Sequence, residues 1–213
     1  MKTISLTIDG REVIAREDDI LLWVALTNGF YIPHLCALKE RAHPFAGCRF
    51  CFVEIEGYSE PVTACTETVR AGMVVSTKTE TIRQLQRTAF ELILSAHHID
   101  CVHCGKNKIC ELQKIAKHLT IKLSPNKLPT IPRNFPCDDS HPLFIYDPDK
   151  CVLCGKCVWV CGEHHKTGVF NFAHRGFNMI VTTFGSSLLG GDECDQCRKC
   201  VEVCPVGALL LKK

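Results

Sequence analysis

Cysteine is the residue type in this chain whose spacing most clearly indicates chemistry. The chain has 213 residues and 16 cysteines, and eight of these cysteines form two runs of one pattern, C-x2-C-x2-C-x3-C. The first run is Cys151, Cys154, Cys157 and Cys161. The second is Cys194, Cys197, Cys200 and Cys204, which Pro205 follows directly. Three thiolates at this spacing fit in one tight loop and can hold one corner of a cubane iron–sulfur cluster, whose fourth ligand must come from elsewhere.

The same run occurs in two-cluster bacterial ferredoxins, where the fourth cysteine of each run binds the other cluster. We therefore predict two [4Fe–4S] clusters with crossed ligands. The first cluster is assigned to Cys151, Cys154, Cys157 and Cys204, and the second to Cys161, Cys194, Cys197 and Cys200. A pair of zinc sites is the alternative, although tetrahedral zinc usually takes its cysteines as separated C-x2-C pairs.

Four further cysteines near the N-terminus have a looser pattern: Cys36, Cys48, Cys51 and Cys65. Plant-type [2Fe–2S] sites have the spacing C-x4-C-x2-C with a remote fourth cysteine. This chain keeps the C-x2-C pair and the remote cysteine but widens the first gap. Spacing alone therefore leaves both a [2Fe–2S] cluster and zinc open here.

The N-terminal cysteines lie among predicted strands. Residues 3–8 alternate apolar and polar, which predicts a strand, and Asp9-Gly10 predicts a hairpin turn. Residues 12–15 are then predicted to form the second strand of the hairpin. Asp18 or Asp19 is expected to cap a helix that ends near residues 28–29. Further strands are predicted at residues 52–56, 62–65 and 73–76. These elements predict a small β-rich domain over residues 1–78.

The segment that follows the N-terminal domain is predicted to be helical. Apolar residues follow helical spacing over residues 78–96, and a short helix is expected to open at Cys110. Residues 119–142 hold five prolines, which is the composition of a linker. Strands are predicted at 143–146, 169–172, 179–183 and 206–211. The fold class is therefore α+β, divided into residues 1–78, 79–119, a linker at 120–142, and a ferredoxin-like module at 143–213.

The order of hairpin, helix, Cys36, the Cys48–Cys51 pair, strand and Cys65 resembles a known family. It is similar to the β-grasp [2Fe–2S] domain that opens the large iron–sulfur subunit of respiratory complex I, the [FeFe] hydrogenases, and the small diaphorase subunit of NAD-reducing hydrogenases. This resemblance implies a β-grasp fold and one [2Fe–2S] cluster on those four cysteines.

The stretch His97-x3-Cys101-x2-Cys104-x5-Cys110 resembles the His-ligated [4Fe–4S] motif of the same families. The resemblance implies a small helical domain and a third [4Fe–4S] cluster, bound by His97, Cys101, Cys104 and Cys110. His98 and His103 are interpreted as surface residues. Fifteen of the sixteen cysteines are then ligands, and Cys137 is left as a spare thiol.

Charge and hydropathy agree with a soluble, metal-loaded protein. Residues 1–9 lack the apolar core of a signal peptide, and the longest apolar run, residues 20–26, is too short to span a bilayer. A reducing cytoplasm is the expected location. The formal net charge is +2 with cysteines counted as neutral. With about −2 per all-thiolate cluster and about −1 for the His-ligated cluster, the loaded chain is expected near −5, so no nucleic-acid partner is indicated.

Fully ligated clusters have no open coordination site, so the chain is expected to transfer electrons and to do no bond chemistry alone. It also has no G-x-G-x-x-G fingerprint for a nucleotide or flavin. The resemblance covers essentially the whole chain, which ends nine residues after Cys204. It implies an iron–sulfur diaphorase subunit of an NAD(P)-linked [NiFe] hydrogenase.

The implied partners are a flavin and NAD(P)-binding subunit and the small and large hydrogenase subunits, with a soluble ferredoxin as a further candidate. Two alternatives remain open. One is the equivalent subunit of an NAD-dependent formate dehydrogenase or of an electron-bifurcating complex. The other is a zinc-stabilised interaction scaffold.

Overall fold

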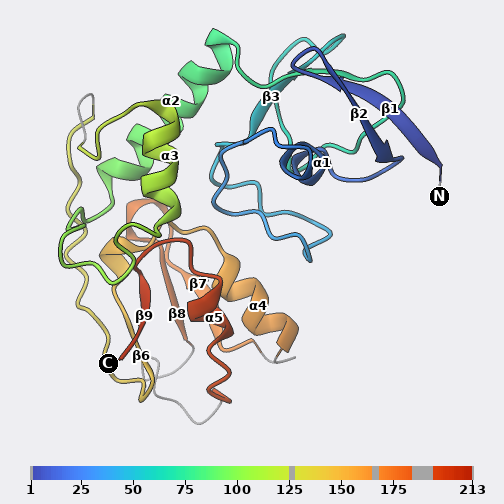
Figure 1. Cartoon of the computed structure of the whole chain (residues 1–213). Helices are drawn as coiled ribbons and strands as arrows, with labels where there is room; N and C mark the ends of the chain where they lie inside the picture. Colours follow the sequence, from blue (N-terminus) through green and yellow to red (C-terminus); the bar gives the residue numbers. More distant parts are fainter. Residues whose placement is uncertain (1, 125–127, 165–167, 184–193, 213) are drawn as a thin grey trace. The chain divides into compact units, whose positions relative to one another are not determined.

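The computed structural model describes residues 2–124, 128–164, 168–183 and 194–212 (Figure 1). Contacts between residues divide the chain into two compact units. The N-terminal unit holds residues 1–90 and 118–121, and the C-terminal unit holds residues 91–117 and 122–213. Helices α2 (Glu80–Ser95) and α3 (Glu111–Leu119) contribute residues to both units. Each unit is described by itself below.

The N-terminal unit is built on a five-stranded sheet with the order β2-β1-β5-β3-β4. The strands are β1 (Thr3–Ile8), β2 (Arg11–Arg16), β3 (Phe52–Ile55), β4 (Val62–Thr63) and β5 (Val74–Ser76). The predicted hairpin is confirmed, because β1 and β2 pair antiparallel with Ile8 opposite Arg11. Asp9 and Gly10 turn the chain with φ of 48° and 78°, the backbone region that suits a two-residue hairpin loop. β5 then runs parallel to β1 and antiparallel to β3.

Helix α1 (Leu21–Thr27) buries Leu21, Leu22, Val24 and Ala25 in the same core as the strands. The predicted cap by Asp18 or Asp19 is wrong, because Ile20 holds the N-cap position without a side-chain hydrogen bond. The free amides of the first turn instead donate to the loop after β4. The Leu21 amide donates to the Glu67 carbonyl at 2.8 Å, and the Leu22 amide to the Ala64 carbonyl at 3.0 Å.

The C-terminal unit holds two small antiparallel sheets and short helices. β6 (Phe144–Tyr146) pairs with β9 (Leu209–Leu211), and β7 (Phe170–Ala173) forms a hairpin with β8 (Ile180–Thr183). A 3-10 turn, Pro148–Lys150, leads from β6 into the first cysteine run. The helices α4 (Lys156–His164) and α5 (Lys199–Glu202) continue the two runs and contact each other.

The proline-rich segment is tied to the C-terminal unit by its backbone. The Ile131 amide donates to the Ser95 carbonyl at 2.6 Å, where α2 ends. The Phe135 amide donates to Asp149 Oδ1 at 3.2 Å. Asp138 and Tyr146 exchange two backbone hydrogen bonds of 2.8 Å. These contacts hold an extended chain in place although its prolines remove many of its own donors.

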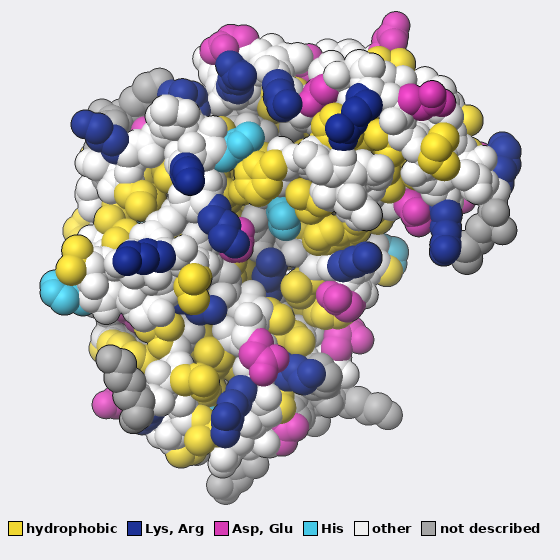
Figure 2. All heavy atoms as spheres, viewed as in Figure 1, with side chains coloured by type: hydrophobic (Ala, Val, Ile, Leu, Met, Phe, Trp, Pro, Cys, Tyr) yellow, Lys and Arg dark blue, Asp and Glu magenta, His cyan; other side chains and the backbone are white. Residues whose placement is uncertain are grey.

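Surface charge is mixed on the face that Figure 2 shows, with Lys and Arg side chains interspersed with Asp and Glu. This agrees with the small formal net charge of +2. In the part of the chain that the structure describes, no helix has both the length and the apolar character needed to cross a membrane.

Candidate iron–sulfur sites

The four N-terminal cysteines are gathered in the core of their unit, and we call them the Cys36 site. Each is at most 9% exposed. The Sγ atoms of Cys36 and Cys48 lie 3.4 Å apart, and the Leu35 amide donates to Cys48 Sγ at 3.4 Å. Cys51 and Cys65 form a second pair, in which each thiol shifts the pKa of the other. The strands bring this pair together, because the Ala64 amide donates to the Cys51 carbonyl at 2.8 Å.

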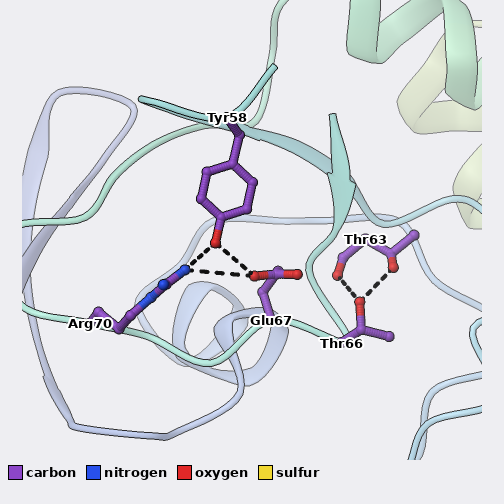
Figure 3. Close-up of polar contacts among 5 residues, drawn as sticks. All are labelled: Tyr58, Thr63, Thr66, Glu67 and Arg70. Carbon is purple, nitrogen blue, oxygen red and sulfur yellow. Dashed lines mark hydrogen bonds and ion pairs between the residues drawn. The ribbon is translucent and has the colours of Figure 1, made fainter. Parts of the chain in front are cut away.

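Polar side chains fix the loop that carries Cys65 (Figure 3). Thr66 Oγ1 lies 2.8 Å from Thr63 Oγ1 and donates to the Thr63 carbonyl at 2.8 Å. One residue further along, the Tyr58 hydroxyl donates to Glu67 Oε2 at 3.3 Å and accepts from Arg70. The loop that carries one predicted ligand is thereby fixed on both sides of it.

The thiols of the Cys36 site share protons in pairs. The pKa of Cys48 is lowered to about 6 by the hydrogen bond from Cys36, against the effect of burial, and the pKa of Cys36 is raised correspondingly. The hydrogen bond between Cys51 and Cys65 lowers the pKa of Cys65 and raises that of Cys51 in the same way. Thiolates are the form that binds iron, and the lowered pKa of Cys48 and Cys65 favours that form.

The second group, which we call the His97 site, is His97, Cys101, Cys104 and Cys110. All four line one pocket in the C-terminal unit. His97 Nδ1 is buried and has no hydrogen-bond partner among the described residues. Burial lowers the pKa of His97 to about 4, so its imidazole is neutral at pH 7. A neutral imidazole with a buried, unpartnered nitrogen suits a metal ligand.

Two residues that sequence reasoning missed also line this pocket, Lys150 and Gly207. A Cβ on Gly207 would lie 2.3 Å from Cys104 Sγ, so only glycine lets the backbone come this close to the sulfur. A hydrogen bond anchors the segment that carries Gly207. The amide of Glu111, the residue after Cys110, donates to the Pro205 carbonyl at 2.9 Å. Gly207 lies far from His97 and Cys104 in the sequence, so no local sequence pattern predicts its contact with Cys104 Sγ.

The other histidines of this stretch differ in their surroundings. The His103 side chain is 81% exposed, and its Nδ1 lies 2.8 Å from Asp100 Oδ1. His98 lines the pocket, although it is exposed as a residue, and its amide donates to the Asp149 carbonyl at 2.8 Å. Cys137 is exposed and is absent from the linings of the pockets that hold the predicted ligands.

The two C-terminal runs share an unusual backbone geometry. Leu153 and Gln196 precede the second cysteine of their runs with φ of 51° and 60°. Gly155 and Arg198 follow that cysteine with φ of 71° and 62°. A positive φ is costly for a side chain such as that of Leu153, and its repetition at matching positions indicates that both loops are curled for the same purpose. Such turns point backbone amides into a concave loop that suits an anionic group.

The last cysteine of the first run, Cys161, lines a pocket with the cysteines of the second run, and the charge of Cys204 acts on cysteines of the first run. Burial raises the pKa of Cys151 to about 11 and of Cys154 to about 12, and the charge of Cys204 adds to both effects. Burial raises the pKa of Cys157 as well, again with a contribution from Cys204. We call Cys151, Cys154, Cys157 and Cys204 the Cys151 site.

The remaining four cysteines line a second pocket of the C-terminal unit, and we call them the Cys194 site: Cys161, Cys194, Cys197 and Cys200. The aromatic rings of Phe144 and Phe170 form part of its wall. The pKa of Cys200 is raised to about 12, first by burial and then by the charge of Cys161. Buried thiols of this kind lose their protons when iron binds them. Within the described residues, no three His, Cys, Asp or Glu side chains converge at distances that suit a single metal ion.

Family models match four parts of the chain. Residues 1–80 match a 2Fe-2S iron–sulfur cluster binding domain, and residues 86–125 match the NADH-ubiquinone oxidoreductase-G iron–sulfur binding region. Residues 143–166 and 191–210 each match a 4Fe-4S binding domain. The coarse fold prediction is confirmed: the chain is a mixed helix and strand protein with [2Fe–2S] and [4Fe–4S] ferredoxin-type domains.

Curated relatives and a solved structure cover nearly the whole chain. The NADP-reducing hydrogenase subunit HndD of Solidesulfovibrio fructosivorans is 35% identical over 99% of this chain, which spans 36% of that relative. The NAD-reducing hydrogenase HoxS subunit gamma of Cupriavidus necator is 28% identical over 99% of this chain and 88% of its own length. A chain in the crystal structure of an NAD+-reducing [NiFe]-hydrogenase in the H2-reduced state matches with a TM-score of 0.86 and 29% identity, over 98% of this chain and 87% of that one. The chain is therefore similar over nearly its whole length to subunits of NAD(P)-reducing hydrogenases and matches iron–sulfur binding domains, as the resemblance of its motifs implied.

Proposed function

We propose that the chain relays electrons through one [2Fe–2S] and three [4Fe–4S] clusters between two partner subunits. The observation that carries this proposal is the grouping of its ligand candidates. Fifteen cysteines and His97 fall into four groups, each largely buried or lining a pocket, and Cys137 belongs to none of them. Bound clusters would supply one-electron transfer, and complete ligation leaves no position for a substrate.

The ligand assignment follows the four groups. The Cys36 site would hold the [2Fe–2S] cluster, and the His97, Cys151 and Cys194 sites would each hold a [4Fe–4S] cluster. The crossed position of Cys204 supports the exchange of fourth ligands between the two runs. The unpartnered Nδ1 of His97 supports imidazole as the fourth ligand of its site.

The protein itself would exclude water, orient the sulfurs and stabilise charge. The buried sulfurs of the Cys36 site are shielded from solvent, and the Leu35 amide donates to one of them. Hydrogen bonds to sulfur, burial and nearby charge set the potential of a cluster. The four-part division into residues 1–78, 79–119, 120–142 and 143–213 would then give one β-grasp domain, one small His-ligated domain, a linker and a two-cluster module.

The complex we propose is a cytoplasmic NAD(P)-linked hydrogenase. The HoxS gamma subunit supports this, because this chain spans 88% of its length. The partners would be a flavin and NAD(P)-binding subunit on one side and the small and large [NiFe] subunits on the other. Purification of the native complex tests this directly, because a [NiFe] large subunit should co-purify, and a molybdopterin subunit in its place would contradict the proposal.

The cluster content is tested by metal analysis of the anaerobically purified chain. Two irons for the [2Fe–2S] site and four for each other site give about fourteen irons per chain, with a similar amount of acid-labile sulfide. EPR of the reduced protein should resolve more than one cluster signal. Several zinc atoms per chain without sulfide would instead support a zinc-stabilised scaffold.

A further inference from the structure

The pocket of the His97 site has one wall with a positive charge. Lys150 ends the 3-10 turn directly before Cys151, and its side chain is only 16% exposed. Its Nζ lies 2.9 Å from Asp147 Oδ2, whose side chain is 19% exposed. Lys150 lines the pocket together with His97 and Cys104, whereas Asp147 does not. The charge of Lys150 thus acts on Cys104, whereas the charge of Asp147 acts on His97.

Lys150 and Cys104 both lie next to Gly207. A Cβ built on Gly207 would lie 3.9 Å from Lys150 Cδ and 2.3 Å from Cys104 Sγ. The lysine stem and the cysteine sulfur therefore flank the same glycine. The ion pair with Asp147 Oδ2 at 2.9 Å holds the positive charge of Lys150 in this place.

We propose that Lys150 is a positioning residue that sets the reduction potential of the His97 site by holding a sheltered positive charge beside Cys104. The inference rests on the proposed function, because it concerns a cluster bound at that site. Reduction adds one negative charge to the cluster. A cation at the pocket wall stabilises the reduced form more than the oxidised form and raises the potential, and shelter from water strengthens this effect.

Other charged or titratable groups also line the pocket of the His97 site. Asp100 also lines the pocket and has the opposite sign, but its side chain is 34% exposed and its carboxylate contacts His103 at 2.8 Å. Exposure to solvent weakens its field at the ligands. His98 lines the pocket as well and is exposed as a residue. Lys150 is the most sheltered of these flanking charges, so its effect should exceed that of Asp100.

The experiment uses the full chain with its clusters, purified anaerobically and titrated with a reductant while EPR signals are recorded. A His97→Ala variant first identifies the signal of the His97 site by its loss. Lys150→Met should then shift the midpoint potential of that signal to a lower value, and Lys150→Arg should leave it close to that of the wild type. Asp100→Asn should shift the same signal in the opposite direction and by less.

Lys156 offers a matched control in the same unit. It opens α4, and its charge acts on Cys154 of the Cys151 site. Lys156→Met removes the same charge with the same side chain. It should leave the potential of the His97 signal unchanged, and it should affect the signal of the Cys151 site.

The outcomes separate this inference from the proposed function. An unchanged potential in a Lys150→Met chain with full iron content would overturn the inference and leave the four-cluster relay intact. A wild-type chain that lacks the His97 signal would overturn the relay assignment first. If Lys150→Met loses iron, the same measurements are made on Lys150→Gln, which removes the charge but keeps a polar side chain. A lower midpoint potential of the His97 signal with full iron content would then support the inference. A loss of iron there too would show that Lys150 holds the shape of the site, and the inference would be wrong.

Discussion

His97 differs from the other predicted ligands in charge and in how it reaches its site. It follows the end of α2 by two residues, and its amide donates to the Leu94 carbonyl at 3.2 Å. This bond continues the helical turn and directs the imidazole into the pocket that the three cysteines line. Because the imidazole is neutral, the site carries one negative charge less than an all-cysteine site.

We therefore expect His97→Cys to lower the reduction potential of this cluster. The added thiolate makes the site more negative, which disfavours the uptake of an electron. Redox titration followed by EPR measures the shift. His103→Ala is the control, because that side chain is 81% exposed and should leave the signal unaltered. An identical signal and potential in His97→Cys would contradict imidazole ligation.

Gly207 gives a second prediction at this scale. The methyl group of Gly207→Ala would lie 2.3 Å from Cys104 Sγ, so either the sulfur or the backbone must move. We expect a loss of about four irons per chain, or a changed EPR signal, at the His97 site alone. Gly162→Ala serves as the control, because a Cβ there meets no atom of the described residues within 4 Å. Full iron content and an unchanged spectrum in Gly207→Ala would contradict this close approach.

The secondary structure elements show where local sequence patterns suffice. The β1–β2 hairpin was predicted because its side chains alternate between the core and solvent, and the turn residues suit its geometry. The cap of α1 was predicted wrongly. A local rule expects a neighbouring side chain to accept from the first amides, whereas the Glu67 and Ala64 carbonyls do so from a loop about forty residues away.

The two cysteine runs allow a prediction at the scale of elements. If the runs exchange their last ligands, Cys204→Ser should damage the cluster of the first run more than that of the second. Cys161→Ser should have the converse effect, because Cys161 lines the pocket of the second run. EPR and iron analysis of both variants make each the control of the other. The reverse pattern of loss would show that each run binds its own cluster.

At the scale of the whole molecule, cysteine spacing predicts which ligands belong together but says nothing of the residues that surround them. Cysteine spacing is short-range information, so each tight loop could be recognised from the chain alone. The walls of the His97 pocket combine residues near 100, Lys150 and Gly207. Such a pocket depends on tertiary packing between distant segments, which no spacing rule describes. That is why Lys150 and Gly207 were not foreseen.

Net charge offers a prediction for the molecule as a whole. The metal-free chain has a formal charge of +2 and an isoelectric point near 7.9. Four bound clusters would bring the charge to about −5 at pH 7. The loaded chain should therefore bind an anion exchanger at pH 7, and the metal-free chain should pass through it. Equal retention of the two forms would contradict the proposed cluster content.

The loop around Cys65 has a consequence for how the protein matures in the cell. Its Ala64 and Glu67 carbonyls accept from the first amides of α1, so a ligand-bearing loop also completes a helix. A newly made chain cannot finish this helix until the loop has folded, and iron would hold the loop once delivered. Cluster insertion and the folding of the N-terminal unit are then coupled steps of one process. Iron starvation should accordingly leave a chain that proteases cut within residues 21–27.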